Sequence, residues 1–411
     1  MFNSKTDLKR KKKWAIEKLK TGEFIATVEP LSSSHGSFWE HLLRIKRLNN
    51  EYPPFVKCRL CYEMLSYSIL NGTSTSSYHF KNCLDESNTL KNKKTLDRVK
   101  HMAIEIVDSH HHLWSLSPTN PTKYKWLRPV SEGGASWHYA GDIECLKRDY
   151  LLNDYLRDAT NASYHLIKSV HVQAEADDPI EEVKFLEQIS NENSNGFPHG
   201  IVAHANLASS ELSKLLETYT HEYPRVKGIR QLLNWSTKDS RLSMIDRSDY
   251  LTDKTWLEGF QLLTSYSLSF DFHVYPSQMI DASKIARQYP NAILILDHCG
   301  LPVDGKNDFN SWKEGMRHMA EQSNVICKLS GLVMFNHAWS KEILAPYILE
   351  CLRLFTPKRC MFGSNFPVDK LNITYEELVN VYRDIGENDA GLSKDELELI
   401  FKYNAIKTYR L

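Results

Sequence analysis

From residue 104 onward, short runs of β-branched and aromatic residues alternate with longer stretches of helical periodicity, and this alternation strongly constrains the fold. It is typical of βα units arranged around a parallel sheet. The candidate strands are Ile104–Asp108, Lys168–Gln173, Gly200–Ala205, Arg225–Gln231, Ser267–His273, Ala292–His298, Val325–Leu329 and Arg359–Ser364. Eight such units in roughly 300 residues predict an α/β fold of the (β/α)8 TIM barrel class.

Each candidate strand ends in polar or charged side chains that a buried parallel strand has little reason to carry. These residues are His110 and His112, Gln173 and Glu175, His204, Arg230, His273, Asp297 and His298, Lys328 and Ser330, and Ser364 and Asn365. In a barrel, the carboxyl ends of the strands converge on one mouth, where active sites are built. We therefore predict that these side chains surround a common pocket.

The first candidate strand runs into a histidine triplet in the segment IEIVDSHHHL, residues 104–113. Residues two apart in an extended strand point to the same side, so His110 and His112 can converge on one metal ion. Histidine-rich triplets also occur on surfaces and in linkers. This triplet ends an Ile- and Val-rich strand, which favours a metal site.

The composition is that of a globular protein: 411 residues, 42% hydrophobic and 25% charged. No apolar run approaches the roughly 18 residues of a membrane span, and the basic start MFNSKTDLKRKKKW lacks the apolar segment of a signal peptide. We therefore expect an intracellular protein, in the cytoplasm or, if its N-terminal part binds DNA, in the nucleus. The 8 cysteines form no dense framework of the secreted kind, so we expect reduced thiols, some of them available to metal.

The formal net charge of zero conceals an uneven distribution. Residues 1–103 contain 19 Lys and Arg against 10 Asp and Glu, whereas the remaining residues contain 32 against 41. A basic N-terminal part suggests a polyanionic partner, although runs such as Lys9–Lys13 are also common in solvated tails.

Two close pairs of metal-binding residue types lie in the basic part. Cys58 and Cys61 have CxxC spacing, and His79 and Cys83 follow as HxxxC after 17 intervening residues. Each pair can clamp one edge of a tetrahedral zinc ion. We expect a basic, disordered leader over residues 1–37, a zinc-binding module over residues 38–90, a linker over residues 91–103 and the barrel over residues 104–411.

The module resembles the BED-type zinc finger, a DNA-binding domain. The resemblance includes an aromatic residue, Phe38 or Trp39, before the metal pairs, and Phe55 ahead of Cys58. It departs from the pattern in its last ligand, Cys83, and in lacking a clear Leu-rich helix between the pairs. It implies a zinc ion and duplex DNA as partner. The alternatives are a decayed finger, four coincidental residues in a low-complexity extension, or an accidental fusion that shares no function with the barrel.

The barrel part resembles the amidohydrolase-2 branch of the amidohydrolase superfamily, which includes sugar-acid lactonases. The segments that carry the resemblance are VDSHHHLW at 107–114, HVQAE at 171–175, KGIRQ at 227–231, FDFHVYPSQ at 270–278, ILDHCGLP at 295–302, CKLSG at 327–331 and RCMFGSNFPVD at 359–369. The resemblance implies that His110, His112 and His298 are metal ligands, and that His273 lies where the wider superfamily often has a histidine ligand. Zinc or manganese bound there would activate a water molecule. Members of the lactonase branch can also work without a tightly held metal, in which case the histidines contact substrate.

Other strand-end residues keep two interpretations each. Glu175 could orient a histidine or contact substrate, or be a surface acid before a helix. Arg230 suits recognition of a substrate carboxylate or ring oxygens, or a structural ion pair. His204 suits either the pocket wall or the packed core.

Asn365 departs from the superfamily, which commonly has Asp at the end of strand 8 as a proton carrier. An amide cannot titrate, so Glu175, Asp297, Asp369 or a histidine would have to replace it. Opening a lactone to an alkoxide needs less leaving-group protonation than cleaving an amide. We therefore predict a hydrolase that opens a lactone of a sugar acid or a related cyclic ester. The alternative is a zinc-dependent DNA-binding protein whose barrel is inactive or only senses a ligand.

Overall fold

The computed structural model describes residues 104–136, 138, 140–161, 163–303 and 309–411, together with four short strands earlier in the chain. The chain divides into two compact units, Met1–Met102 and Ala103–Leu411. In the first unit the strands are β1 (Phe24–Thr27), β2 (Leu42–Arg47), β3 (Phe55–Cys58) and β4 (Met64–Ser66), paired antiparallel in chain order. Of the predicted zinc ligands, Cys61, His79 and Cys83 lie outside the described residues, as does the side chain of Cys58 at the end of β3. The zinc finger therefore stays a prediction.

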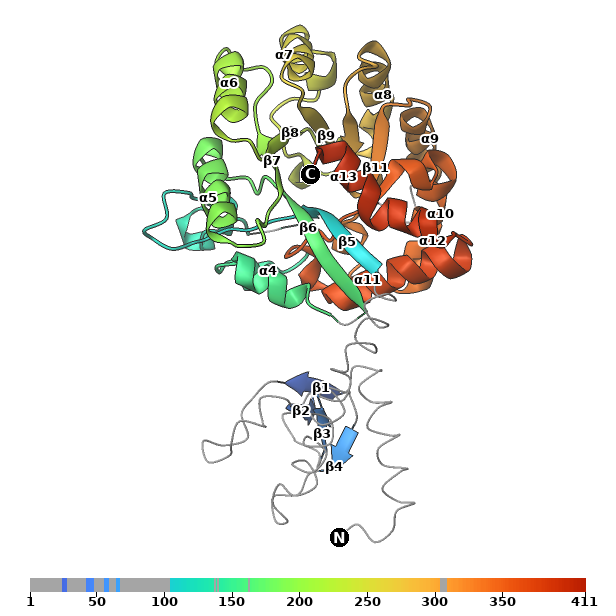
Figure 1. Cartoon of the computed structure of the whole chain (residues 1–411). Helices are drawn as coiled ribbons and strands as arrows, with labels where there is room; N and C mark the ends of the chain where they lie inside the picture. Colours follow the sequence, from blue (N-terminus) through green and yellow to red (C-terminus); the bar gives the residue numbers. More distant parts are fainter. Residues whose placement is uncertain are drawn as a thin grey trace. The chain divides into compact units, whose positions relative to one another are not determined.

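Eight parallel strands form the second unit, as predicted (Figure 1). They are β5 (Ile104–His111), β6 (Tyr164–Val172), β7 (Gly200–His204), β8 (Val226–Leu232), β9 (Ser269–His273), β10 (Leu294–Leu296), β11 (Val325–Leu329) and β12 (Cys360–Phe362). Neighbours in sequence are neighbours in the sheet. The ends of the sheet meet where the His112 amide donates to the Phe366 carbonyl at 2.7 Å and the Asn365 amide donates to the His110 carbonyl at 2.7 Å. The sheet is therefore a nearly closed barrel.

Helices surround the strands (Figure 1). They are α4 (Leu152–Asp158), α5 (Pro179–Glu192), α6 (Leu212–Glu222), α7 (Lys254–Ser265), α8 (Met279–Gln288), α9 (Phe309–Ala320), α10 (Lys341–Phe355), α11 (Tyr375–Asp384), α12 (Lys394–Glu398) and α13 (Asn404–Tyr409). The local sequence determines where several of these helices begin. Asp178 accepts hydrogen bonds from the amides of Ile180 and Glu181 at the start of α5, and Thr374 forms a capping box with Glu377 at the start of α11. No helix among the described residues is long and apolar enough to cross a membrane.

The apolar core has two layers because side chains alternate along each strand. Inside the barrel lie Val107, Val170, Val172, Val202, Ile295 and Met361, with Ala405 and Tyr409 of α13 packed against them. A larger set packs between the strands and the surrounding helices. The remaining interior positions, towards the carboxyl ends of the strands, carry polar side chains.

A register irregularity directs the histidine triplet. Asp108 pairs with Ser169, but the next pairing is His111 with His171, so β5 has one extra residue here. Asp108 accepts a hydrogen bond from the Tyr155 hydroxyl, and the His111 ring stacks on the same tyrosine at a centroid distance of 4.1 Å. Both residues therefore face the outer layer although they are three apart, and the bulge turns His110 and His112 to the other side.

The sixth barrel strand, β10, is shorter than the expected Ala292–His298. It ends at Leu296, because His298 and Cys299 have left-handed backbone conformations, with φ of 52° and 51°. The chain turns sharply here and sends these consecutive side chains in different directions.

Candidate active site

A cavity of about 200 Å³ lies at the carboxyl ends of the strands. Six residues that the sequence predicted for the site line this pocket: His112, Glu175, Arg230, His273, His298 and Asn365. The other lining residues are Trp114, Trp126, Ala135, His138, Ala174, Leu232, Arg241, Met244, Met334 and Val368. The pocket thus has a polar floor at the strand ends and a mainly apolar rim.

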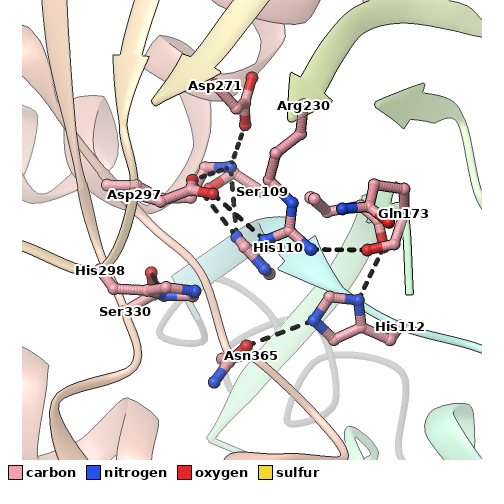
Figure 2. Close-up of polar contacts among 12 residues, drawn as sticks. Ser109, His110, His112, Gln173, Arg230, Asp271, Asp297, His298, Ser330 and Asn365 are labelled. Carbon is pink, nitrogen blue, oxygen red and sulfur yellow. Dashed lines mark hydrogen bonds and ion pairs between the residues drawn. The ribbon is translucent and has the colours of Figure 1, made fainter. Parts of the chain in front are cut away.

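The histidines of the floor lie next to one another (Figure 2). The ring centroid of His110 is 5.0 Å from that of His112 and 4.5 Å from that of His298. His273 lies 5.3 Å from His298. The carboxyl ends of β5, β9 and β10 therefore bring four imidazoles together.

Hydrogen bonds set the orientation of these rings. The Nδ1 atom of His112 donates to the Val172 carbonyl at 2.7 Å, because a carbonyl can only accept. Nδ1 of His298 pairs with the Ser330 hydroxyl at 2.9 Å, and Nδ1 of His273 pairs with Oδ1 of Asn234. Burial is the main cause that lowers the pKa of His112 and His298 well below the usual range and that of His273 to about 3. The rings are therefore neutral, and in His112 the lone pair lies on Nε2.

Asn365 points its carbonyl oxygen at this lone pair. Its Oδ1 lies 3.4 Å from Nε2 of His112, while its Nδ2 donates to Oδ1 of Asp369 at 2.7 Å. Burial raises the pKa of Asp369 well above its usual range, and the hydrogen bond from Asn365 opposes this rise. Two acceptors, which follow β5 and β12, thus face each other. A hydrogen-bond donor or a cation between them would satisfy both.

Residues 107–411 match the family model Amidohydro_2, described as amidohydrolase. The chain belongs to the amidohydrolase-2 family. Uncharacterized protein y4mH of Sinorhizobium fredii is 36% identical over 310 residues, which cover 75% of this chain and 99% of that protein. The L-fucono-1,5-lactonase of Burkholderia multivorans is 26% identical over 320 residues, covering 74% of this chain and 96% of the lactonase.

Solved structures agree in fold. A crystal structure of a Burkholderia multivorans amidohydrolase with bound zinc has a TM-score of 0.61 and 23% identity, and the match covers 75% of this chain and 100% of that one. The family match and the lactonase relative identify the second unit of this chain as a hydrolase domain.

A buried charge network lies beneath the amidohydrolase pocket (Figure 2). The ammonium of Lys328 lies 2.7 Å from Oδ2 of Asp271, 2.9 Å from Oδ1 of Asp297 and 3.3 Å from Nδ1 of His110. Arg230 reaches Oδ2 of Asp297 at 3.4 Å and donates to the Gln173 carbonyl at 2.6 Å. The two cations and two carboxylates compensate one another, as buried charges must.

The two carboxyls differ in acidity. Burial opposes ionisation of Asp297, but the charge of Lys328 and the neighbouring His110 outweigh it and hold the pKa of Asp297 well below its usual range. Burial, reinforced by Asp297 and opposed by Lys328, raises the pKa of Asp271. Asp297 is therefore the more acidic of the two carboxyls.

Three of these residues fit a divalent metal ion. His110, Asp297 and His298 each offer one ligand atom, and these atoms lie within 4.8 Å of one another. Nε2 of His110 is buried and has no hydrogen-bond partner among the described residues. Neutral imidazole and carboxylate suit zinc or manganese. His112 and His273, which the family resemblance also implied as ligands, are not part of this set.

The remaining predicted residues lie at the edge of the floor or outside it. Glu175 has an exposed side chain at the pocket and accepts a hydrogen bond from the Gln173 amide at 2.7 Å. His204 is not among the lining residues, and its carbonyl accepts a hydrogen bond from the Tyr219 hydroxyl at 2.9 Å. Its side chain is partly buried and is not among the groups that face the pocket.

Sequence reasoning gave Lys328 no role and missed Asp271. A signal was available, because Asp271 lies two residues before His273 within a predicted strand and so faces the same side. A charged residue there implies a buried partner, and Lys328 near the end of β11 has the opposite charge.

The segment between β5 and β6 supplies four of the rim residues, Trp114, Trp126, Ala135 and His138. The Trp126 ring lies 5.6 Å from that of Trp114 and stacks on His138 at 5.8 Å. Its Nε1 donates to the Ala174 carbonyl at 2.9 Å. A partly buried tryptophan therefore stands over the pocket in a fixed orientation.

Proposed function

We propose that the barrel domain opens a lactone of a sugar acid or a related small cyclic ester. The observation that carries this proposal is the floor of the pocket, where neutral imidazoles lie beside Arg230 and an uncharged Asn365 replaces an ionisable strand-end group. The L-fucono-1,5-lactonase relative, which matches 74% of this chain, supports the substrate class.

The reaction adds water across the ester bond. The water oxygen forms a bond to the carbonyl carbon, the bond from that carbon to the ring oxygen breaks, and the proton lost by water ends on the ring oxygen, which becomes a hydroxyl. The product is one hydroxy acid. Because the leaving group stays attached, the enzyme has to move only one proton over a short distance.

His112 is placed to hold that proton. Its Nδ1 already donates to the Val172 carbonyl, so a proton accepted at Nε2 would point towards Oδ1 of Asn365, 3.4 Å away. Both ring nitrogens would then have an acceptor. In this role Asn365 stabilises a charged imidazole without titrating itself.

Arg230 keeps the floor ready for this step. Its charge is the second cause, after burial, of the low pKa of His112, and it also depresses the pKa of His273 and His298. As the pocket's buried cation, it also stabilises the negative charge that develops on the carbonyl oxygen. A divalent ion held by His110, Asp297 and His298 would polarise the carbonyl and lower the pKa of water.

The test is hydrolysis of a panel of sugar-acid lactones by the full chain, followed with a pH indicator. The assay is run after chelation and after readdition of zinc or manganese. We expect turnover well above spontaneous opening and above that of a His110→Ala, His112→Ala variant. If no lactone is opened faster than by that variant under any metal condition, the proposal is wrong.

A second proposal concerns the N-terminal unit and rests on its sequence alone. The two metal-binding pairs that include Cys58 and His79, and the excess of Lys and Arg in residues 1–103, lead us to propose zinc-dependent binding of duplex DNA. Gel-shift of the full chain at two salt concentrations, with Cys58→Ser as control, tests this. Absence of a zinc-dependent shift at low salt removes the proposal, because phosphate contacts are strongest there.

A further inference from the structure

Four of the five cysteines whose side chains the structure describes lie together behind the active site. Cys299 follows β10, Cys327 lies on β11, Cys351 on α10, and Cys360 begins β12. Each of the four is 0% exposed. The sulfur atoms of Cys299, Cys327 and Cys351 lie within 4.8 Å of one another.

Cys360 belongs to the same cluster. Cys327 and Cys360 are direct partners in the register of β11 and β12, so their side chains leave the sheet on the same side. Both belong to the apolar layer between strands and helices, which also contains Cys351 and Cys299. The thiol of Cys327 interacts with those of the other three cysteines. A strand, a turn and a helix thus bring the sulfurs of Cys299, Cys327 and Cys351 together, and Cys360 lies beside Cys327 on the neighbouring strand.

We propose that Cys299, Cys327 and Cys351 bind a thiophilic divalent ion, zinc, with Cys360 as the fourth ligand. Four thiolates around one ion are the usual closed set of a structural zinc site. On binding, each thiol releases its proton to solvent and forms a sulfur–metal bond, and no atom changes oxidation state. This site is separate from the nitrogen and oxygen donors of the active site.

A cation and a hydroxyl lie near the cluster. The Arg359 guanidinium is close enough for its charge to interact with Cys360 and Cys327, while it donates to the carbonyls of Gln322, Val325 and Ala320. The Tyr382 hydroxyl is buried and has no hydrogen-bond partner among the described residues, and the charges of Cys299 and Cys351 influence its pKa. Both groups would stabilise the net negative charge of a four-thiolate zinc complex. The thiols of Cys299 and Cys360 donate to the carbonyls of Lys328 and Cys351, each at 3.7 Å, and would give up these hydrogen bonds on binding the ion.

Burial also determines how the ion would enter. Because none of the four sulfurs belongs to an exposed residue, the ion has to enter while the domain folds. We therefore expect metal that resists chelators in the folded protein.

The cluster would act on the active site through one peptide unit. His298 lines the pocket, and its neighbour Cys299 faces the cluster, with both residues in left-handed conformations. A metal bond to Cys299 would hold this unfavourable turn in place. Cys299 is then a positioning residue for His298.

Cobalt(II) provides the test, because thiolate ligands give it an intense charge-transfer absorption that nitrogen and oxygen ligands do not. The full chain carries Cys58→Ser, Cys61→Ser and Cys83→Ser, so that only the cysteines of the barrel domain contribute. It is produced in medium containing cobalt(II) chloride. We expect the sulfur-to-cobalt band, its persistence in a further Cys145→Ser variant, where the exposed cysteine is lost, and its disappearance in Cys351→Ser.

A cobalt-loaded protein that shows no sulfur band overturns the proposal, as does a band that Cys351→Ser leaves unchanged. If Cys351→Ser does not fold, the chain with only Cys58→Ser, Cys61→Ser and Cys83→Ser is produced with zinc, and X-ray absorption at the zinc edge decides instead. Sulfur neighbours at about 2.3 Å support the site, and a shell of nitrogen and oxygen alone refutes it.

Discussion

The floor and the rim of the pocket are made in different ways. The floor residues His112, Arg230 and His298 project from strand ends or the turns that follow them, and hydrogen bonds to neighbouring strands or turns hold them. The rim residues Trp126 and His138 lie in the long segment between β5 and β6 and contact each other by stacking. The floor is a charge-compensated network whose side chains have few alternative arrangements, whereas the rim is mainly a set of apolar surfaces.

The difference indicates where chemistry and selectivity reside. A proton can be moved reliably only by groups held to a fraction of an ångström, which strand ends provide. A stacked aromatic ring tolerates many ligands, so loops can change the substrate without changing the reaction. Substitutions in the floor should therefore reduce kcat, and substitutions in the rim should raise KM.

The largest effect is expected from the histidine pair of the floor. A His110→Ala, His112→Ala variant removes a proposed metal ligand and the proposed proton carrier together, so kcat for lactone opening should fall at least about 10³-fold. Steady-state kinetics of the full chain measures this. His111→Gln is the matched control, because His111 lies between the two in sequence but stacks on Tyr155 in the outer layer. An equal loss of kcat in the control would contradict the division between inner and outer histidines.

Removal of the cation under the floor should cost stability. Lys328→Met leaves Asp271 and Asp297 buried without the ammonium that compensates them, at 2.7 and 2.9 Å in the wild type. The expected loss in free energy of unfolding is about 4 kcal/mol, measured by denaturant unfolding. Adding Asp271→Asn should recover part of the loss, because it removes one uncompensated charge. A stable single variant would show that the network is not needed to hold the floor.

The sequence predicts the floor better than the rim for a physical reason. Strand periodicity locates the carboxyl ends of the strands, and polar residues such as Arg230 and His298 stand out there against apolar runs. Trp126 and Trp114 lie in a segment without periodicity, so no pattern indicates that they meet. The bulge that turns His110 inward is also invisible, because it depends on pairing with β6 and not on local residue type. His204, at a strand end like the others, shows that this position alone does not put a side chain in the pocket.

Glu182 of α5 joins the two regions and should give the protein a pH-dependent stability. Its carboxyl group accepts a hydrogen bond from the backbone amide of Ala174 at 2.7 Å, and the Ala174 carbonyl accepts a hydrogen bond from Nε1 of Trp126. Burial raises the pKa of Glu182 to about 7 from an ordinary value near 4.5. Since the folded-state pKa is the higher one, the contribution of Glu182 to stability is fully present below about pH 4.5 and is lost as the pH rises through about 7.

Glu182→Gln tests this sign. The amide can still accept from Ala174 but cannot ionise, so the variant should lack the part of the decline in unfolding free energy that Glu182 causes, at most about 3 kcal/mol. Unfolding of both proteins between pH 5 and 8 measures the difference. If the two curves run parallel, Glu182 does not titrate in this window.

The smallest effect is expected from the rim. Trp126→Ala removes a ring that packs on Trp114 and His138, and a stacked aromatic contact is worth about 1 kcal/mol, so KM should rise roughly fivefold. We expect kcat to change little, because no floor group contacts this ring in the described contacts. Trp126→Phe should restore most of the affinity, since it keeps the stacking surface and loses only the hydrogen bond to the Ala174 carbonyl. A fall in kcat with unchanged KM would place Trp126 in the reaction itself and erase the distinction between rim and floor.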